Sequence, residues 1–198
     1  MSREIELKVP LTQEQFEKIH EILSGKKVLP AFNFHSFEHI IKSDEYFSRY
    51  HSHEERIKNK ELRVIRIRTE KTDGGDEKSY FCIKQKTIEN GVEFNSEKET
   101  FVEDADVLRA FFEASGFIRW FEKKKDAISV YVTLSEKPDF EAHLELEKVN
   151  SLPYIEIEYT KEDLPADQVR AGLEKILLAL GVDPKKRDSR SWAEILES

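Results

Sequence analysis

Hydrophobic and polar residues alternate along much of this chain, starting with its first segment. There the aliphatic residues Ile5, Leu7 and Val9 alternate with charged ones, so an extended backbone would have one aliphatic and one charged side. Residues 26–38 are rich in Phe and fit no clear pattern. The same period of two in other segments predicts antiparallel strands at residues 3–9, 39–50, 61–70, 78–88, 92–103, 119–134, 140–149 and 154–160.

Two helices are predicted from the spacing of a capping box. Thr12 and Gln15 have this spacing ahead of an apolar stripe that ends near Gly25. Ser191 and Glu194 repeat the spacing and predict a short helix near the end of the sequence.

Two further amphipathic helices are predicted among and after the strands. One is capped by Asp104 or Asp106 and stops at Gly116. The other is capped by Asp163 and stops at Gly181. Their apolar stripes can cover the aliphatic face of the sheet.

Turn residues indicate how the strands connect. The pair at 90–91, Asn-Gly, is the strongest hairpin indication in the chain. The segments 73–75 and 137–139 also have the composition of turns. Each turn joins two neighbouring strand patterns, which favours antiparallel pairing.

The charged residues on these strands are sorted by sign. Each pair is spaced by two and therefore lies on one face of its strand. The basic pairs are Arg66 with Arg68, Lys84 with Lys86, and Lys123 with Lys125. The acidic pairs are Glu97 with Glu99, Glu145 with Glu147, and Glu156 with Glu158, while Glu4, Glu6 and Lys8 share a face of the first strand.

This charged face decides between two architectures. With helices on the aliphatic face, the charged face lies either in open solvent or inside a closed sheet. Uncompensated charge in a closed interior costs several kcal/mol per ion, so the interior has to be wet, self-neutralising or filled by ligand and metal. We expect the closed form in a single domain, residues 1–198: an α+β fold with an eight-stranded antiparallel β-barrel, or tunnel, a charged interior, and helices packed outside.

Composition restricts the partners. The formal net charge of -8 makes duplex nucleic acid a poor partner, although a local basic cavity is compatible with it. The single cysteine, Cys82, permits no internal disulfide and is expected to be a small core residue in a reducing compartment. No apolar run approaches the ~20 residues of a membrane span. We therefore expect a cytoplasmic protein that does not bind membranes.

The ordered set of charged pairs resembles the CYTH superfamily, also called the triphosphate tunnel metalloenzymes. The segment Glu4-x-Glu6-x-Lys8 opens the set, and the other pairs follow in the family order over essentially the whole chain. Members include thiamine triphosphatases, inorganic triphosphatases, messenger RNA capping triphosphatases and class IV adenylyl cyclases. The resemblance implies an eight-stranded antiparallel tunnel with helices outside.

The resemblance also implies a role for each charged set. Basic side chains would hold phosphate oxygens, and the implied substrate-binding residues are Lys8, Arg66, Arg68, Lys84, Lys86, Lys123, Lys125 and Arg190. Carboxylates would hold Mg²⁺ or Mn²⁺, and the implied metal ligands are Glu4, Glu6, Glu97, Glu99, Glu147, Glu156 and Glu158. Glu4, Glu6 and Lys8 are the implied catalytic residues.

Some positions depart from the family pattern. Glu147 stands where the family usually has Asp, and Lys125 stands where Arg is common, so bidentate contact with phosphate is lost there. Arg190 is expected to close over the phosphate tail. Trp192 replaces a family Tyr, and no role is assigned to it.

The implied function is metal-dependent hydrolysis of the terminal phosphate of inorganic triphosphate or of a small organic triphosphate, namely thiamine triphosphate or a nucleoside triphosphate. A metal-oriented water would attack, and a nearby glutamate would accept the proton. A class IV-type adenylyl cyclase, which makes cyclic AMP and pyrophosphate from ATP, is the first alternative. A non-catalytic polyphosphate or nucleotide-binding module is the second. A homodimer stays an open expectation.

Two other patterns have simpler interpretations. His35 and His39, or His51 and His53, could suggest a transition-metal site, but no third ligand is evident. The segment Asp44-x-Tyr46-Phe47 fits a structural role, with Phe47 packing outward, at least as well as a substrate contact.

Overall fold

The computed structural model describes the chain apart from residues 1, 62, 90–91, 162 and 198, and apart from the side chains of residues 2–4, 86–89 and 92–95. Its strands are β1 (Ser2–Pro10), β2 (Phe32–Ser48), β3 (Arg63–Thr72), β4 (Lys78–Glu89), β5 (Val92–Val102), β6 (Ile118–Leu134), β7 (Lys137–Val149) and β8 (Leu152–Tyr159). Its helices are α1 (Gln13–Leu23), α2 (His53–Lys58), α3 (Ala105–Ala114), α4 (Ala166–Ala179), α5 (Trp192–Leu196) and the 3₁₀-helix η1 (Pro184–Lys186).

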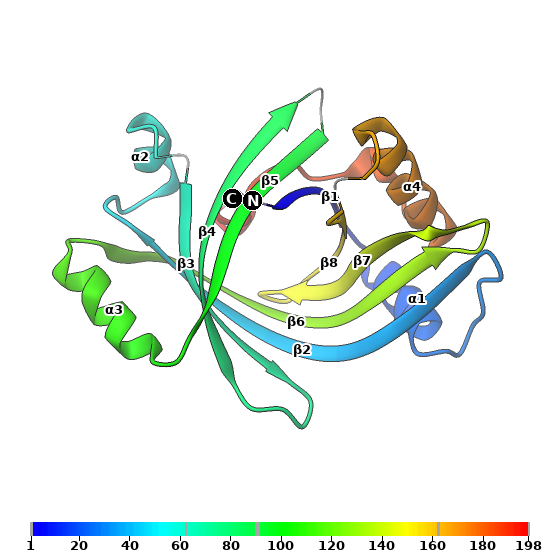
Figure 1. Ribbon diagram of the computed structural model, residues 1–198, viewed down its shortest axis with the longest axis horizontal. Coiled ribbons are helices and arrows are strands. Elements are labelled where there is room, and N and C mark those ends of the chain that lie inside the picture. Colours follow the sequence, from blue (N-terminus) through cyan, green and yellow to red (C-terminus); the bar gives the residue numbers. More distant parts are fainter. Residues whose placement is uncertain (1, 62, 90–91, 162, 198) are drawn as a thin grey trace.

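Every one of these strands pairs antiparallel with a neighbour on both sides. The order is β1-β5-β4-β3-β2-β6-β7-β8, and β1 pairs with β8 as well as with β5, so the pairings run in a ring. The helices α1 and α4 lie at one end of the view in Figure 1, and α2 and α3 lie at the other. The predicted α+β class and the eight antiparallel strands are confirmed.

Two hydrophobic clusters attach the helices to the strands. The larger one joins β1, β6, β7 and β8 to α1 and α4, and it includes Ile5, Leu7, Leu144, Ile157, Leu173 and Ile176. Each such side chain contributes roughly 1.5–3 kcal/mol by leaving water. The fit is close: a Cβ added at Gly172 of α4 would lie 2.3 Å from Cζ of Phe140.

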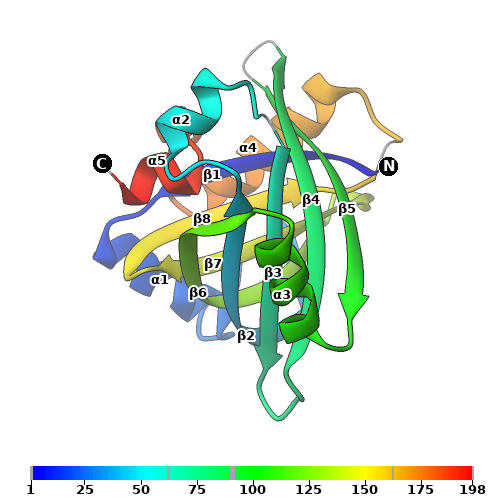
Figure 2. The same cartoon turned by 90° about the vertical axis from the view of Figure 1, so that its left-hand side faces the viewer.

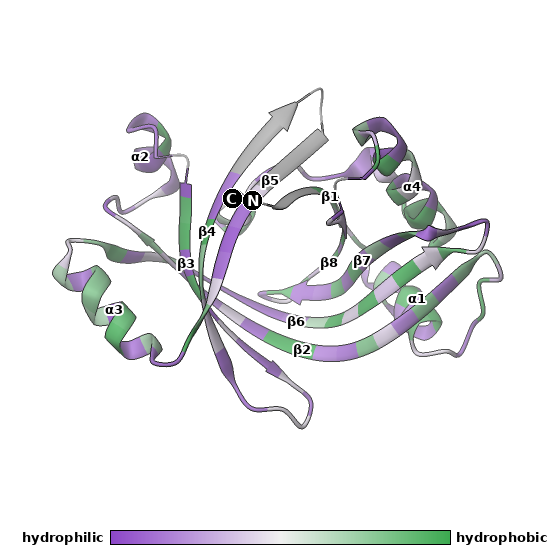
Figure 3. Cartoon of the chain, in the orientation of Figure 1, coloured by the Kyte–Doolittle hydropathy of each residue, from purple (hydrophilic) through white to green (hydrophobic). Residues whose placement is uncertain are grey.

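Hydrophobic and hydrophilic residues alternate along β2 and β6, as Figure 3 shows.

The smaller cluster holds α3 against the other part of the sheet. Phe112 of α3 lies 4.7 Å, between ring centroids, from Phe47 of β2 and 5.8 Å from Phe81 of β4. Ile67 of β3 completes this cluster with no exposed surface. Figure 2 shows α3 lying over β3. The outward packing expected of Phe47 is therefore observed.

Most helix ends form as predicted. Both capping boxes are present, with Thr12 accepting from Gln15 and Ser191 accepting from Glu194. Asp104, rather than Asp106, caps α3. No helix within the described residues is both long enough and apolar enough to cross a membrane.

The cap predicted for α4 is wrong. Pro165 occupies the N-cap position, and it makes no side-chain hydrogen bond there. Asp163 instead accepts a hydrogen bond of 2.6 Å from the hydroxyl of Tyr159. The acidic residue therefore ties the end of β8 to the loop that follows it.

The segment without a clear assignment is partly strand. β2 begins at Phe32, but Ser36 has a φ of 56° and the register with β6 shifts between His35 and Glu38. This irregularity breaks the alternation that marks a regular strand. His35 and His39 therefore both lie on this irregular strand.

Two further differences concern connections. The short helix α2 was not predicted, although Ser52 caps it by accepting from the backbone N–H of Glu55. The turn predicted at 137–139 is wrong, because β7 already begins at Lys137 and the turn lies at 135–136. The predicted hairpin turn of Asn90 and Gly91 lies outside the described residues.

His39 joins two segments on the side of β2 that faces away from Lys42 and Asp44. Its Nδ1 lies 2.9 Å from Asp73, after β3, and its Nε2 lies 2.8 Å from Asp126 of β6. The hydrogen bonds to Asp73 and Asp126 raise the pKa of His39.

We expect this contact to make stability depend on pH. Because the pKa is higher in the folded protein than in the unfolded chain, the stabilisation is complete below about pH 6.5 and is lost as the pH rises through the folded-state value. In urea unfolding, wild type should exceed His39→Gln by more at about pH 5.5 than at about pH 8.5. His51→Gln, at an exposed position, is the control. A difference between wild type and His39→Gln that is constant over this range would contradict the expectation.

Candidate active site

Charged side chains from the strands are buried together on the face opposite the hydrophobic clusters. Alternation along each strand turns these residues to one side, and the antiparallel register places them opposite each other. The buried charged residues on this face are Lys8, Lys42, Asp44, Arg66, Lys123, Lys125, Glu145 and Glu147. Their mutual contacts divide them into a basic cluster and an acidic cluster.

The basic cluster is built around Asp44, which has no exposed surface. Arg68 donates to both of its oxygens, at 2.7 and 3.0 Å, and Lys123 lies 3.0 Å away. Nη1 of Arg66 lies 3.7 Å from the same carboxylate. Burial favours the neutral acid, but Arg68, Lys123 and Arg66 outweigh it and hold the pKa of Asp44 well below its usual value. Asp44 therefore keeps three cations together.

Arg66 and Lys84 extend the cluster toward β1 and β5. Nη2 of Arg66 donates to Glu97 at 3.0 Å, and Nζ of Lys84 lies 3.4 Å from Glu6 and 3.8 Å from Glu97. Nε of Arg66 is buried and has no hydrogen-bond partner within the described part of the chain. One donor of this guanidinium is therefore left for a ligand.

Cys82 lies among these charges. It is buried, which confirms the expected small core residue, and its Sγ donates to Oε1 of Glu97 at 2.9 Å. Burial raises the pKa of the thiol to about 12, which keeps it protonated. Oxygens of Glu97 and Glu99 lie with this sulfur within 4.8 Å of one another.

The acidic cluster consists of Glu145 and Glu147 on β7 and Glu156 on β8. One oxygen from each lies within 4.8 Å of the others, a spacing that could hold a metal ion. Nζ of Lys125 lies 3.1 Å from Glu145 and 2.5 Å from Glu156, and it also forms an ion pair with Glu147. Lys42 forms a further ion pair with Glu145. One ammonium group thus contacts all three carboxylates.

These carboxylates differ in their proton affinity. Burial, followed by the nearby Glu156, raises the pKa of Glu147 to about 8. Glu156 is also buried, but Lys125, Lys123 and Lys8 lower its pKa to about 2. Oε1 of Glu147 has no hydrogen-bond partner within the described residues, whereas Oε2 contacts Lys125. A carboxyl with the pKa of Glu147 is largely protonated near neutral pH, so a bound cation would displace that proton.

Glu158 lies beside this cluster and contacts a histidine. Nδ1 of His143 is 2.9 Å from Glu158, and its Nε2 is 2.7 Å from Oγ of Ser129. These distances resemble a hydrolytic triad. Burial lowers the pKa of His143, but the bond to Glu158 outweighs burial and the net change is upward. The imidazole is thus held between the Ser129 hydroxyl and the Glu158 carboxylate.

The segment after α4 contacts the same face. Nζ of Lys8 donates to the carbonyl of Arg190 at 2.6 Å and lies 4.7 Å from the ring of Trp192. Nε1 of Trp192 donates to Glu156 at 3.0 Å, and Lys123 lies 5.4 Å from its ring. Trp192, to which no role was assigned, therefore touches both clusters.

Arg190 points elsewhere. Its side chain is half exposed, and its guanidinium pairs with Asp188 at 2.7 Å. In this conformation it does not reach the buried cations that it was expected to join. The side chains of Glu4 and Lys86 lie outside the described residues.

The structure thus brings together most of the predicted residues. The basic ones are Lys8, Arg66, Arg68, Lys84, Lys123 and Lys125, and the acidic ones are Glu6, Glu97, Glu99, Glu147, Glu156 and Glu158. Sequence reasoning did not include Lys42, Glu145 and His143. Glu145 was visible as the partner of Glu147 in an acidic pair, and Lys42 shares the alternating face of β2 with Asp44. His143 had no comparable pattern.

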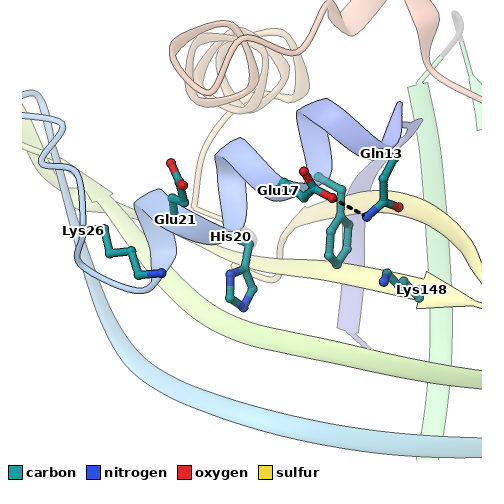
Figure 4. A pocket seen from close by; sticks show the side chains of 7 residues that line it. Gln13, Glu17, His20, Glu21, Lys26 and Lys148 are labelled. Atoms are coloured by element: carbon teal, nitrogen blue, oxygen red, sulfur yellow. Dashed lines mark hydrogen bonds between the residues drawn. The ribbon is translucent and has the colours of Figure 1, made fainter.

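A separate groove lies on the outside of the molecule, along α1 and the end of β7. Figure 4 shows its labelled side chains, among them Gln13 donating to Glu17 at 2.9 Å, with His20 and Lys148 nearby. It mixes acidic and basic residues and shares none of them with the buried clusters. We do not place the active site there.

Comparison with known proteins gives matches in fold. No protein-family model and no curated protein matches the chain. The PH1819 protein of Pyrococcus horikoshii OT3 is 24% identical with a TM-score of 0.69, covering 98% of each chain. A proposed adenylate cyclase from Vibrio parahaemolyticus is 17% identical with a TM-score of 0.67, again covering 98% of each.

The proposed adenylyl cyclase HpAC1 from Hippeastrum, described as having a dominant triphosphatase activity, is 14% identical with a TM-score of 0.61. The match covers 100% of this chain and 95% of that one. At these identities the similarity shows the fold. The resemblance to CYTH-type proteins that was stated from the sequence is confirmed at that level.

Asp44 offers a direct test of the basic cluster. Asp44→Asn should lower the free energy of unfolding by about 3–5 kcal/mol, because it leaves buried cations without their counter-charge. Inorganic tripolyphosphate should restore part of this loss, so its effect on Tm should be larger for the variant than for wild type. Calorimetric melting measures both effects.

The neighbouring residue supplies the control for this experiment. Glu45 faces the other side of β2 and pairs with Arg109 at 2.6 Å. Glu45→Gln should leave the response to tripolyphosphate unchanged. If Asp44→Asn responds no more than Glu45→Gln does, the three cations do not form an anion site.

Proposed function

We propose that this protein is a metal-dependent triphosphatase that cleaves the terminal phosphate of inorganic triphosphate or of a small organic triphosphate. In this proposal the ring of strands is a barrel, and the substrate lies inside it between the basic cluster and the acidic cluster. The class of enzyme agrees with the fold comparison, and the reaction is our inference from the residues.

The observation that carries the proposal is unused hydrogen-bonding capacity on both sides of the site. Within the described part of the chain, Nε of Arg66 is a buried donor without a hydrogen-bond partner, and Oε1 of Glu147 is a buried acceptor without one, while Oε2 of Glu147 contacts Lys125. Each such group costs about 1–3 kcal/mol when it stays unsatisfied. A donor among cations fits an anion, and acceptors among carboxylates fit a cation. A polyphosphate with a divalent cation supplies both.

The carboxylate oxygens of the acidic cluster suit Mg²⁺ or Mn²⁺, which prefer oxygen ligands. Glu145, Glu147 and Glu156 would hold the ion, with Glu6 and Glu158 beside them. When bound, such an ion neutralises phosphate charge and makes a water more nucleophilic.

The basic residues would do the remaining work. Arg66 and Arg68 bind phosphate oxygens through planar guanidinium groups, and Lys84 and Lys123 add compact charges. Asp44 positions Arg68 and Lys123 before substrate arrives, which reduces the reorganisation needed in the transition state. Because phosphoryl transfer depends mainly on charge neutralisation and alignment, no serine or cysteine nucleophile is required.

An adenylyl cyclase is the second candidate, and the proposed cyclase from Vibrio parahaemolyticus favours keeping it. The same clamp would then align the α-phosphate for attack by the ribose 3′-hydroxyl. HpAC1, described with a dominant triphosphatase activity, favours hydrolysis.

Product analysis tests the proposal. Purified protein is incubated with tripolyphosphate, thiamine triphosphate or ATP, with Mg²⁺ or Mn²⁺, and all products are resolved. We expect phosphate release, and we expect Arg66→Gln and Glu156→Gln each to lower kcat/KM by about 100-fold or more, the scale for losing one preorganised charge contact. Lys148→Gln, outside the site, should behave as wild type. Cyclic AMP with pyrophosphate as the main products would favour the cyclase, and binding without turnover would reject both enzymes.

Lys125 should compete with the metal ion. Its ammonium group contacts the three carboxylates that would bind the ion. Without triphosphate, Lys125→Met should therefore bind Mn²⁺ about tenfold more tightly than wild type, a difference of about 1.4 kcal/mol. Titration calorimetry measures it, with Lys148→Met as the control. Equal or weaker affinity in Lys125→Met would show that the ion binds elsewhere.

A further inference from the structure

A single row of side chains leads from the basic cluster to an aromatic pair, the half-buried Tyr80 and the exposed Phe101. Lys123 lies opposite Asp44, Asp44 opposite Arg68, Arg68 opposite Tyr80, and Tyr80 opposite Phe101. Directly opposed residues in antiparallel strands point to the same face of the sheet. Tyr80 and Phe101 therefore share the face that carries the candidate site.

Exposure rises along this row. Lys123 and Asp44 are buried, with 3% and 0% of their surface exposed, whereas Phe101 is 59% exposed. The rings of Tyr80 and Phe101 meet edge to face, with centroids 6.1 Å apart. The row thus begins among buried cations and ends at an aromatic surface that solvent reaches.

The other exposed phenylalanines have a different setting. Phe111 of α3 is 62% exposed, but α3 packs through Phe112 on the outer face, against Phe81. Phe81 lies opposite Thr100, so it points away from the face of Phe101. Phe37 is 49% exposed and lies where the register of β2 with β6 shifts. Of the exposed phenylalanines that the structure describes, Phe101 alone lies in the row of Arg68 and Tyr80.

Tyr131 is a further exposed aromatic residue near this face, but it is already stacked. His35 lies 5.9 Å and His143 lies 5.2 Å from its ring, measured between centroids. A planar ligand would have to displace an imidazole there. Tyr80 and Phe101 offer ring surface without that cost.

The span between the two ends of the row suits an organic triphosphate. Arg68 and Phe101 lie two strands apart, which is about 10 Å at about 4.8 Å per strand. A phosphate chain held by Arg68 and Arg66 can place its organic group over the aromatic pair. Glu99, two residues before Phe101 and on the same face, adds a carboxylate that can accept from an amino group on that ring.

We propose that Tyr80 and Phe101 form a subsite for the planar aromatic group of an organic triphosphate. This inference rests on the proposed function of the neighbouring cations. It makes inorganic triphosphate the weaker ligand, because that molecule has no group to stack on the pair. A nucleobase and the pyrimidine or thiazolium ring of thiamine share the required chemistry.

Binding measurements without added divalent cation test the subsite apart from turnover. Wild type, Phe101→Ala and Tyr80→Ala are titrated with ATP, thiamine triphosphate and inorganic tripolyphosphate by calorimetry. Phe101→Ala should weaken binding of at least one organic triphosphate by about tenfold, the scale of losing one ring contact, and should leave tripolyphosphate unchanged. The ligand that loses more affinity identifies the ring. Phe111→Ala, an equally exposed phenylalanine outside the site, is the matched control.

The outcomes separate this inference from the proposed function. If tripolyphosphate binds to wild type and Phe101→Ala has no selective effect on either organic ligand, the subsite is rejected while the phosphate site stands. If tripolyphosphate does not bind at all, the proposed function fails first. An equal loss for all three ligands would also reject the subsite, since it would indicate a general disturbance of the sheet. Tyr80→Phe should retain selective binding that Tyr80→Ala loses.

Discussion

The need to neutralise the charges buried on one face of the strands governs this structure. The buried cations on this face contact carboxylates from neighbouring strands. The single carboxylate of Asp44 contacts three of them, Arg66, Arg68 and Lys123. Breaking one such contact leaves an uncompensated buried charge, which is costly. The same contacts hold the side chains in the positions that a phosphate chain and a cation would need. Stability of the ligand-free protein and readiness for its ligand therefore have one physical origin.

The hydrophobic clusters make this inner face possible. They lie on the outer face of the strands, where α1 and α4 cover one part and α3 covers another. Buried ion pairs contribute little net stability, because removing charges from water is costly. The apolar burial on the other face therefore supplies most of the stabilisation. The apolar face of the strands thus supplies cohesion, and the charged face carries the candidate site.

The fold could be predicted largely from the alternation of residues, because period, capping boxes and sorted charges agree with one another. The prediction failed where local rules compete. The irregular backbone around Ser36 interrupts the alternation of hydrophobic and polar residues along β2. Asp163 is of a residue type that often caps helices, but it accepts a hydrogen bond from Tyr159 instead. At the site, the spacing of residues predicted which side chains share a face. It could not predict which cation contacts which carboxylate, because that depends on strand register, as the contacts of Lys125 show.

The position of Lys42 and Asp44 on β2 has a consequence for how the sheet assembles. Lys42 forms an ion pair with Glu145, and Asp44 forms one with Arg68. Both side chains project from the same face of β2. A shift of β2 by one residue would turn Lys42 and Asp44 to the opposite face. Glu145 and Arg68 would then each lose a partner of opposite charge. Correct pairing is therefore distinguished from its nearest error by electrostatics as well as by apolar contact. The buried charged face therefore helps to specify the register of strand pairing.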